Sequence, residues 1–509
     1  MEKEKRPSGL PIIIVTGASG FIGHYFLEAF KYDFYIYALA RRSQKEAGIT
    51  MHKNINWIRV DIGEKEMVEA VIDKIALQGG ADYLLHLAAY YDFGNGDNIE
   101  YKRTNVLGTK YILENATKLN LKRLIFASSV IVTEYFEPDL IVDESSPANA
   151  NFPYAKSKYE CEEMIKKYAS VFPCAIVRLA AIFSDWCEYG PLYVFLSNWL
   201  SNSWKSRMIA GKGTSAVPYF HVKNLNGFIA EIIKKSDHLP QLLTLVAAND
   251  GCCMHKQLFE IAVRYNYSYD ISPRFMPKWF VSCGIILMDI WGRIRGMRPF
   301  ERPWMIKYID HQLNVDASKS REILSWKPIA RYEILRRILF LIENMKSDPV
   351  EWDRKNEEVI YKQAPVLPNL KIYEIMLLLE DEIKNSFVEK ITGVEYQQKF
   401  KTYQSLGINT LKERIEYIYR MLKIAVRTGD RLHVLAYARN LALERFKENF
   451  EAQEVINAIR FFADFIVEKL NAHPQLKNME QRIHDQIMMT IQLIADEIED
   501  SFDRLMGLD

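Results

Sequence analysis

The sequence predicts an α/β fold with a doubly wound parallel sheet, followed by an all-α bundle. Short apolar runs rich in β-branched residues alternate with helical patterns in the first part of the chain. The first run leads directly into the glycine-rich turn Thr16–Gly23. The last third has helical periodicity and few glycines or prolines. Because 509 residues exceed what one core normally holds, at least two domains are expected.

The first expected strand covers residues 12–15, whose continuous apolar character suits a strand buried on both faces. A helix is expected directly after the glycine turn, at residues 21–30. Further strands and helices then alternate, which predicts parallel strand pairing. The remaining expected strands are 34–40, 55–60, 83–88, 124–128 and 175–180, and the remaining expected helices are 64–77, 99–118 and 154–170.

The glycine turn predicts a dinucleotide site of the Rossmann type. Gly17 would allow the tight turn, Gly20 would let the backbone approach a pyrophosphate, and Gly23 would let the helix pack close to the strand. The helix N-terminus adds N–H donors and a partial positive charge.

The end of the second strand bears on the choice of cofactor. A site for NAD usually places Asp or Glu there, to hold the ribose 2′-hydroxyl. This chain has Arg41, Arg42 and Ser43 instead, which suit a 2′-phosphate through charge-assisted contacts. We therefore expect NADP rather than NAD, with two solvated surface arginines as the alternative interpretation.

Tyr154 and Lys158 are four residues apart and so share one face of the expected helix. An ammonium beside a phenol lowers the pKa of the phenol, which can then exchange a proton with a carbinol. The pair therefore predicts a hydride-transfer site.

Composition excludes several other classes of protein. A net charge of +1 gives no indication of nucleic-acid binding, and the six cysteines lack CxxC spacing, which predicts reduced thiols in a cytoplasmic protein. No Cys/His cluster is present, so no metal is expected. No apolar run reaches the length of a membrane span. The stretch Trp279–Trp291 is expected to form the wall of a pocket or core rather than to contact a membrane.

Ordered motifs make residues 10–345 resemble the extended short-chain dehydrogenase/reductase family, with a substrate lobe at about 180–330. Two catalytic motifs are a serine at a strand end and a YxxxK pair. The matching segments are Thr16–Gly23, Asp61 with Ile62, His86–Ala89, Asn105–Thr109, Phe126–Ser129, Tyr154 with Lys158, Arg178, Tyr219–Val222, Asp316–Lys319 and Leu324–Pro328.

The resemblance implies roles for individual residues. Tyr154 would be the general acid or base, Lys158 would lower its pKa and bind the nicotinamide ribose, and Ser129 would orient the substrate oxygen. Asn105 is implied as a fourth member, although a buried asparagine that braces a helix is an equal alternative. The implied cofactor contacts are Gly17, Ser19, Gly20, Phe21, Ile22, Gly23, Arg41, Arg42, Asp61, Ile62, Leu87, Ala88, Ala89, Tyr154 and Lys158.

Departures from the family pattern bear on the reaction. Sugar-nucleotide dehydratases place Asp-Glu after the catalytic hydroxyl residue, whereas Val130 and Ile131 follow Ser129 here. Leu179, Lys223 with Asn224, and Ser325 also differ from the family pattern. Apolar and aromatic residues are expected to line the pocket, as in dihydroflavonol reductases and 3β-hydroxysteroid dehydrogenases. They are Tyr90–Phe93, Trp186, Tyr189, Trp199 and the stretch Phe275–Trp291.

The C-terminal third is expected to be a separate domain. A polar, proline-containing stretch at 346–370 predicts a linker, and residues 371–509 predict five or six amphipathic helices packed as a bundle. Breaks are expected near Gly393, Gly407, Gly429 and Pro474. The bundle is expected to serve dimerisation or docking of a protein partner.

Together these observations predict an NADP-dependent oxidoreductase, an oligomer of identical chains, that interconverts a ketone or aldehyde and an alcohol on a small hydrophobic molecule. Two alternatives stay open. One is a nucleotide-sugar epimerase, and the other is a regulatory protein that senses NADPH and signals through the bundle.

Overall fold

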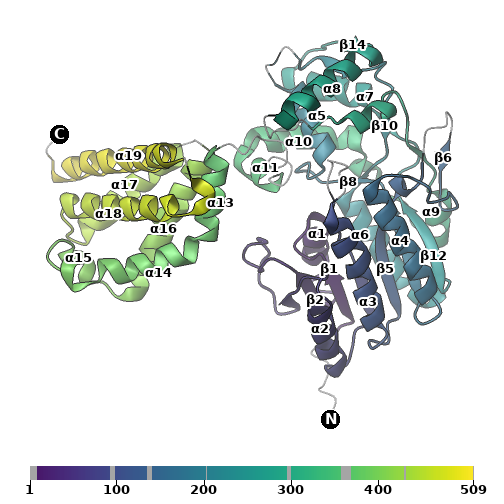
Figure 1. Cartoon of the computed structure of the whole chain (residues 1–509), viewed down its shortest axis with the longest axis horizontal. Coiled ribbons are helices and arrows are strands. Elements are labelled where there is room, and N and C mark those ends of the chain that lie inside the picture. The colour runs from purple at the N-terminus through teal and green to yellow at the C-terminus, as the bar shows by residue number, and fades with distance from the viewer. Residues whose placement is uncertain are drawn as a thin grey trace. The chain divides into compact units, whose positions relative to one another are not determined.

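The computed structural model describes residues 9–91, 98–134, 140–201, 203, 205–294, 300–356, 368–428, 431–477 and 479–507. By its internal contacts the chain divides into two compact units, Met1–Gln363 and Ala364–Asp509 (Figure 1). All six cysteines are free thiols. Among the described helices, none combines the length and apolar character that crossing a bilayer would need.

The first unit is built on a seven-stranded parallel sheet with the order β12-β7-β5-β4-β1-β2-β3. This confirms the predicted fold class and all six predicted strands within two residues. The seventh, β12, was not predicted and extends the sheet beyond β7. The strands are β1 (Ile12–Thr16), β2 (Tyr35–Ala40), β3 (Ile55–Arg59), β4 (Tyr83–His86), β5 (Arg123–Ser129), β7 (Cys174–Leu179) and β12 (Leu242–Ala247).

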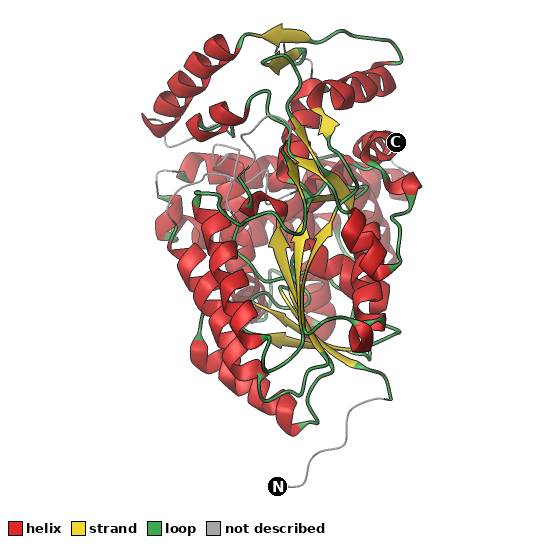
Figure 2. Cartoon of the chain, turned by 90° about the vertical axis from the view of Figure 1, so that its right-hand side faces the viewer, coloured by secondary structure: helices red, strands yellow, loops and turns green. Residues whose placement is uncertain are grey.

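Helices cover both faces of this sheet (Figure 2). Alternate residues of β1 feed two separate cores, because successive side chains of a strand point to opposite faces. Ile13 packs with α1 and α6, whereas Ile12 packs with α2, α3 and α4. These helices are α1 (Phe21–Phe30), α2 (Lys65–Leu77), α3 (Gly108–Ala116), α4 (Pro153–Tyr168) and α6 (Val222–Lys234).

The helix predicted at 99–118 is divided in two. Its first part is a π-helix, η1 (Tyr101–Leu107), and α3 continues from Gly108. A π-turn widens the backbone spacing and often marks a functional site. Here it carries Asn105.

The region predicted to be the substrate lobe is assembled from elements between β7 and the end of the first unit. Its core includes Phe183, Leu192, Phe259 and Leu341. The remaining elements of this unit are η2 (Val130–Val132), β6 (Ile141–Val142), β8 (Ala181–Phe183), α5 (Gly190–Trp199), β9 (Met208–Ala210), β10 (Ala216–Val217), β11 (Tyr219–His221), η3 (Ser236–His238), β13 (Cys253–Met254), α7 (His255–Tyr267), β14 (Arg274–Met276), α8 (Lys278–Ile294), η4 (Pro303–Tyr308), β15 (Asn314–Val315), α9 (Ser318–Leu324), η5 (Ala330–Tyr332), α10 (Ile334–Ser347) and α11 (Pro349–Lys355).

The start of the predicted linker differs from the structure. Residues 349–355 form α11, and the indole of Trp352 is buried in the core of the substrate lobe. The Asn356 side chain donates to the carbonyl oxygen of Trp186 over 2.8 Å. Residues 346–356 therefore belong to the first unit, and residues 357–367 lie outside the described part of the chain.

The second unit is a helical bundle whose apolar faces meet around Phe387, Tyr419 and Phe462. The predicted breaks at Gly393 and Gly407 fall between helices, and Pro474 begins η7, the short turn between α18 and α19. Gly429 lies outside the described residues. The helices are α13 (Pro368–Leu378), α14 (Glu380–Ile391), η6 (Val394–Tyr396), α15 (Lys401–Gln404), α16 (Ile408–Thr428), α17 (Leu432–Lys447), α18 (Ala452–Asn471), η7 (Pro474–Leu476) and α19 (Glu480–Met506).

Candidate active site

The glycine turn joins β1 to α1 at the carboxyl edge of the sheet. Gly17 has a φ of +71°, and a Cβ atom there would lie 2.7 Å from the backbone nitrogen of Ala88. A Cβ on Gly23 would lie 2.5 Å from the carbonyl oxygen of Gly17. These two positions therefore require glycine, and the turn keeps a bare backbone before the N-terminus of α1. That arrangement fits a pyrophosphate.

The residues after β4 pack directly against this turn. The backbone N–H of Ala88 donates to Oγ1 of Thr16 over 3.2 Å, and that of Leu87 donates to the Thr16 carbonyl over 3.3 Å. Ala89, Phe21 and Ile22 line the large cavity of the unit. The predicted cofactor residues from β1, α1 and β4 therefore lie together at one edge of the sheet.

The two arginines after β2 lie on the same side as the glycine turn. The Arg42 guanidinium donates to the carbonyl oxygen of Ser19 over 2.8 Å, and the Arg41 side chain is exposed. No acidic residue stands directly at the end of β2.

Asp61 is held by neighbours that the sequence did not reveal. Its carboxylate accepts from the Gly63 backbone over 2.9 Å and pairs with Arg103 over 2.8 Å. Burial opposes its charge, but the hydrogen bonds from Arg103 and Gly63 together outweigh burial and leave the pKa of Asp61 below its usual value. Next to it, Ile62 is buried against Gly108.

Ser129 and Tyr154 meet at one cavity of about 980 Å³. Ser129 is the last residue of β5, and its Oγ accepts from the Ile131 backbone over 3.4 Å. Tyr154 lies in the first turn of α4, which begins at Pro153. The strand end and the helix start thus bring two of the predicted catalytic side chains to the same wall.

Lys158 lies behind this wall, one turn further along α4. Its Nζ donates to the carbonyl oxygen of Ala127 over 2.8 Å and lies 5.9 Å from the ring centre of Tyr154. Burial lowers the pKa of Lys158 to about 8. The amine is therefore a buried group close to its titration point at neutral pH.

The predicted lowering of the Tyr154 pKa is wrong for this state of the protein. Burial raises the pKa of Tyr154 above its ordinary value, and the nearby rings of Tyr101 and Tyr189 act in the same direction. The ring of Tyr91 lies tilted against that of Tyr154, with ring centres 4.5 Å apart, so the phenol is surrounded by aromatic groups. Desolvation of the phenolate outweighs any stabilisation by an ammonium.

Asn105 acts as a brace rather than as part of the cavity wall. Its amide nitrogen donates to the Tyr90 carbonyl over 3.0 Å and to Oγ of Ser157 over 2.9 Å, and its amide oxygen accepts from the Tyr90 backbone over 2.6 Å. The π-helix is thereby tied to α4 and to the loop after β4. The geometry of Asn105 matches the alternative interpretation, a buried asparagine that braces a helix.

Arg178 also serves as a brace. It pairs with Glu162 over 3.0 Å, and Glu162 accepts from Oγ of Ser128 over 2.5 Å. All three side chains are buried. This pair fixes the end of β5, and so the position of Ser129, against α4.

The histidines of two matched segments, His86 and His221, are packed. His86 lies between the hydroxyls of Thr16 and Thr109, at 2.6 and 2.9 Å, and burial lowers its pKa to about 3. His221 contacts Asp185 over 3.2 Å and stacks on Tyr332. Within the described part of the chain, no group of three or more His, Cys, Asp or Glu side chains is placed to hold a metal.

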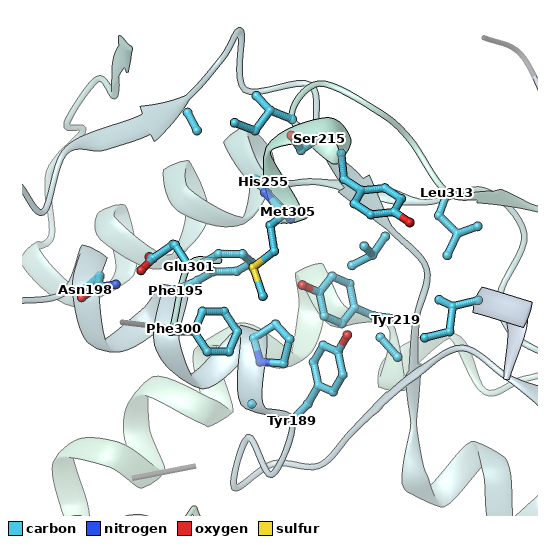
Figure 3. Close-up of a pocket in the computed structure, with 18 of the residues that line it drawn as sticks. Tyr189, Phe195, Asn198, Ser215, Tyr219, His255, Phe300, Glu301, Met305 and Leu313 are labelled. Atoms are coloured by element: carbon cyan, nitrogen blue, oxygen red, sulfur yellow. The ribbon is translucent and has the colours of Figure 1, made fainter. Parts of the chain in front are cut away.

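The cavity is lined mainly by apolar and aromatic side chains (Figure 3). Tyr189 and Tyr219 point into it, with ring centres 6.1 Å apart. The hydroxyl of Tyr219 and the indole N–H of Trp304 are buried without a hydrogen-bond partner among the described residues. Burial lowers the pKa of His255, also in the wall, to about 4, so its imidazole is neutral.

Sequence reasoning found part of this lining. Tyr91, Tyr189, Trp199 and residues 280–288 contribute to it, whereas Trp186 and Phe275 do not. Asp92 and Phe93 lie outside the described residues. Tyr219 also lines the cavity and belongs to the matched segment Tyr219–Val222. Other lining residues share no local motif, because they come from elements far apart in the sequence: Phe152, Phe195, Asn198, His255, Phe300, Trp304 and Tyr308.

Comparison with known proteins agrees with this architecture. A model of the NAD dependent epimerase/dehydratase family matches residues 13–243. The chain is also 30% identical to a putative UDP-glucose 4-epimerase from Methanocaldococcus jannaschii over 223 residues, which are 42% of this chain and 70% of that protein. The chain belongs to the NAD dependent epimerase/dehydratase family.

Further similarities lie within this epimerase/dehydratase family. The N-acetyl-alpha-D-glucosaminyl-diphospho-ditrans,octacis-undecaprenol 4-epimerase of Escherichia coli is 26% identical over 226 residues, covering 44% of this chain and 63% of that protein. A UDP-glucose 4-epimerase structure from Thermotoga maritima, determined with UDP-glucose, matches at a TM-score of 0.51 and 18% identity. It covers 66% of this chain and 99% of that chain, which shows the shared fold.

As a member of the epimerase/dehydratase family, the protein is an enzyme of the extended short-chain dehydrogenase/reductase type that acts on CH–OH groups with NAD(P). The glycine cradle and the Ser129, Tyr154 and Lys158 side chains fit that cofactor and that chemistry. The family matches stop before the second unit.

Proposed function

We propose that this protein is an epimerase that inverts one carbinol centre of a sugar carried on a diphosphate. This is the alternative that the sequence left open, and the relatives favour it over net oxidoreduction of a hydrophobic molecule.

The two residues directly after Ser129 carry the proposal. Val130 and Ile131 occupy these positions, and both line the cavity. Loss of water from a sugar needs a further acid and base besides the tyrosine. Two aliphatic side chains supply neither, so of the two activities in the family name this site supports epimerisation.

Each side chain would then have a distinct part in the reaction. A bound nicotinamide supplies a hydride acceptor and donor for the substrate carbon. As a phenolate, Tyr154 would take the carbinol proton, and as a phenol it would return that proton after the resulting ketone has turned its other face to the nicotinamide. The phenol of the present state would therefore have to lose its proton when cofactor and substrate bind. Ser129 donates a hydrogen bond to the same substrate oxygen and keeps it in place. Lys158 supplies a positive charge near Tyr154.

The cavity favours an apolar carrier over a nucleoside on the diphosphate. Among its described lining residues Lys205 is the one lysine or arginine, whereas aromatic and aliphatic side chains form most of the wall. The Escherichia coli relative acts, by its name, on a sugar joined by a diphosphate to undecaprenol. A lipid-linked sugar diphosphate would account for both the family and the lining.

The test is incubation of the purified full-length protein with UDP-glucose, UDP-N-acetylglucosamine and N-acetylglucosaminyl-diphospho-undecaprenol, with catalytic amounts of NAD+ or NADP+. Proton NMR or chromatography would follow inversion at the sugar carbon. We expect inversion without net cofactor reduction. Stable accumulation of NAD(P)H, or no inversion of any of the three, would reject the epimerase.

A second candidate is a net reductase of a hydrophobic ketone, favoured by Arg41 and Arg42 at the end of β2. An enzyme that consumes reducing equivalents commonly uses NADPH, whereas an epimerase recycles its cofactor. Stoichiometric NADPH oxidation with apolar ketones would establish this candidate. The same arginines lead us to propose NADP over NAD for either reaction. We also propose that the protein acts in the cytoplasm.

For the second unit we propose a role in assembly, either of a homodimer or with a protein partner. Removal of residues 364–509 should change the oligomeric state, measured by analytical ultracentrifugation, while leaving NADPH binding unchanged. A truncated chain that no longer binds NADPH would instead favour a regulator in which the bundle and the cofactor site are coupled.

A further inference from the structure

Helix α8 shows the reverse of the burial pattern of an ordinary surface helix: its acidic side chain is buried, and its apolar side chains are exposed or half-buried. Its one acidic residue, Asp289, is 1% exposed and is paired with Arg293 over 2.9 Å and with Arg302 over 3.6 Å. None of its described apolar side chains, by contrast, is fully buried. Because the ion pairs hold Asp289 inward, the rotational setting of the helix, and with it the exposed face, is fixed.

The outward face is an apolar stripe at helical spacing, with a tryptophan at each end. The most exposed members are Trp279 at 70%, Leu287 at 66% and Trp291 at 57%. Ile286 and Ile290 complete the stripe and are also exposed. A contiguous apolar patch of this kind on a soluble unit marks an interaction surface.

The inward face of α8 lines the cavity, as the sequence predicted for this stretch. Its contributing residues are Phe280, Val281, Gly284, Ile285 and Met288. The outward stripe and the cavity are therefore two sides of a single helix. A ligand part that leaves the cavity past α8 emerges beside the outward stripe.

Exposed cations lie before and after the stripe in the chain and beside the strand that pairs with β14. Arg274 lies in β14 just before α8, Lys278 is the first residue of α8, and Arg293, which pairs with Asp289, lies near the end of the helix. Arg207 and Lys212 flank β9, which pairs with β14 beside α8 (Figure 1). Between residues 274 and 293 the only acid is the buried Asp289, and the exposed acid in the next segment is Glu301.

We propose that α8 docks on the surface of an anionic membrane, with its outward stripe in the interfacial region. Terminal tryptophans prefer the boundary between headgroups and hydrocarbon, and a basic rim is attracted to anionic lipid. A second copy of this chain is a poorer occupant, because an interface between two α8 helices would bring the same cations together. The sequence led us to expect no membrane contact, because an apolar run of this length fits a buried helix and the sequence does not show that one face of it is exposed.

Docking also gives a route for the substrate, a part of the proposal that rests on the proposed function. A sugar diphosphate on a lipid carrier stays anchored in the bilayer, so its reacting ring must enter from the membrane side. With α8 in the interface, the cavity opens beside the carrier, and only the sugar end has to leave the headgroup region.

The first experiment is flotation of the full-length protein with phosphatidylcholine vesicles, with and without phosphatidylglycerol. We expect the protein to float with the anionic vesicles and to be released by salt. The double variant Leu287→Ser/Ile290→Ser, on the outward stripe only, should bind at least tenfold more weakly. The double variant Arg274→Gln/Lys278→Gln should lose affinity only for the anionic vesicles, roughly fivefold per residue.

A matched control is Met489→Ser on α19, since this methionine is 56% exposed and equally apolar. It should change vesicle binding less than twofold. Absence of flotation, or flotation that the double serine variant does not weaken, would overturn the proposal. A concentration-dependent dimer that the serine variant abolishes, without vesicle binding, would assign the stripe to a second copy and equally overturn it.

A second readout separates this proposal from the proposed function. Inversion of a water-soluble UDP-sugar in the absence of vesicles tests the chemistry alone, and the serine variant should keep it. Vesicle binding without inversion would leave the docking surface standing and reject the epimerase. Inversion without vesicle binding would do the reverse.

Discussion

The catalytic edge of the sheet and the substrate lobe differ in whether their buried polar groups have hydrogen-bond partners. At the edge, His86, Asn105 and Lys158 each make hydrogen bonds of 3.0 Å or less within the protein. In the lobe, the Tyr219 hydroxyl and the Trp304 indole lack partners among the described residues. A buried polar group without a partner costs about 1–3 kcal/mol. These buried groups at the edge therefore have partners within the protein, whereas the lobe offers a ligand two polar groups without a partner among the described residues.

The largest expected effect lies at the edge. Tyr154→Phe removes the one hydroxyl that can exchange a proton with the substrate oxygen, so kcat should fall by about 10³ while NADPH affinity is retained. Steady-state kinetics and fluorescence titration measure the two quantities. Tyr159→Phe, on the same helix but exposed, should have no effect. Turnover within tenfold of the original enzyme would remove Tyr154 from the mechanism.

Next in size is Gly17→Ala, which tests whether the edge is rigid. The new Cβ would sit at a φ of +71° and 2.7 Å from the Ala88 nitrogen, so the free energy of unfolding should fall by about 2–4 kcal/mol. Cofactor affinity should fall as well. Denaturant unfolding and titration check both, and Gly407→Ala, with no atom within 4 Å, is the matched control. A stable, fully binding variant would show that the turn adapts.

Lys158 allows a test of whether a buried ammonium lowers the free energy of unfolding. Its pKa of about 8 is below that of lysine in the unfolded chain, so folding must desolvate or deprotonate the ammonium. This cost is full below pH 8 and disappears as the pH rises towards about 10.4, the usual value for lysine. Lys158→Met should therefore stabilise the protein at pH 7, by at most about 3 kcal/mol, and abolish most activity.

The gain in stability from Lys158→Met should shrink between pH 8 and pH 10. Unfolding curves across this range measure it, with the exposed Lys156→Met as control. Destabilisation by Lys158→Met at pH 7 would mean that the bond to Ala127 outweighs the buried charge.

A smaller effect is expected at the cofactor rim. Arg41→Ala removes an exposed guanidinium, and the ratio of kcat/KM for NADPH over NADH should fall about tenfold. Lys53→Ala, also exposed, should leave the ratio unchanged. Equal kcat/KM for both cofactors in the unmodified enzyme would reject the NADP assignment.

The smallest effect should come from the lobe. Tyr219→Phe removes an unpartnered hydroxyl, so the free energy of unfolding should rise by about 1 kcal/mol, while KM for the substrate rises. Tyr189→Phe provides a comparison in the same wall. If both variants left KM unchanged, the Tyr219 hydroxyl would not form a hydrogen bond with a polar group of the ligand.

The edge was predictable from the sequence because its chemistry depends on short-range geometry. The run at 12–15 and the following glycines determine β1, the turn and α1 almost to the residue. Ser129 ends a parallel strand and Tyr154 begins the next helix of the sheet, so their approach follows from topology. The prediction of a lowered pKa for Tyr154 was wrong, because the pKa depends on how deeply the surrounding aromatic side chains bury the phenol, which local spacing does not show.

The lobe was harder to predict because its residues share no local pattern. β12 is a short apolar segment whose partner strand, β7, lies far away in sequence. α11 is a polar segment whose buried side chain, Trp352, packs with residues from distant parts of the chain. The π-helix at Asn105 reads as an ordinary helix until the hydrogen bonds to Tyr90 and Ser157 are seen. For α8, the apolar run indicated the wall of a pocket or core but not that one face of the helix would be exposed.

The reacting side chains Ser129, Tyr154 and Lys158 come from one stretch of about thirty residues, whereas most of the cavity wall comes from residues 179–313. Changes in that second segment can alter which molecules are accepted while the proton-transfer apparatus keeps its geometry. The same scaffold can therefore acquire new ligands by small evolutionary steps, and libraries randomised at wall positions such as Phe195, Phe300 and Met305 are the natural starting point for redirecting this enzyme.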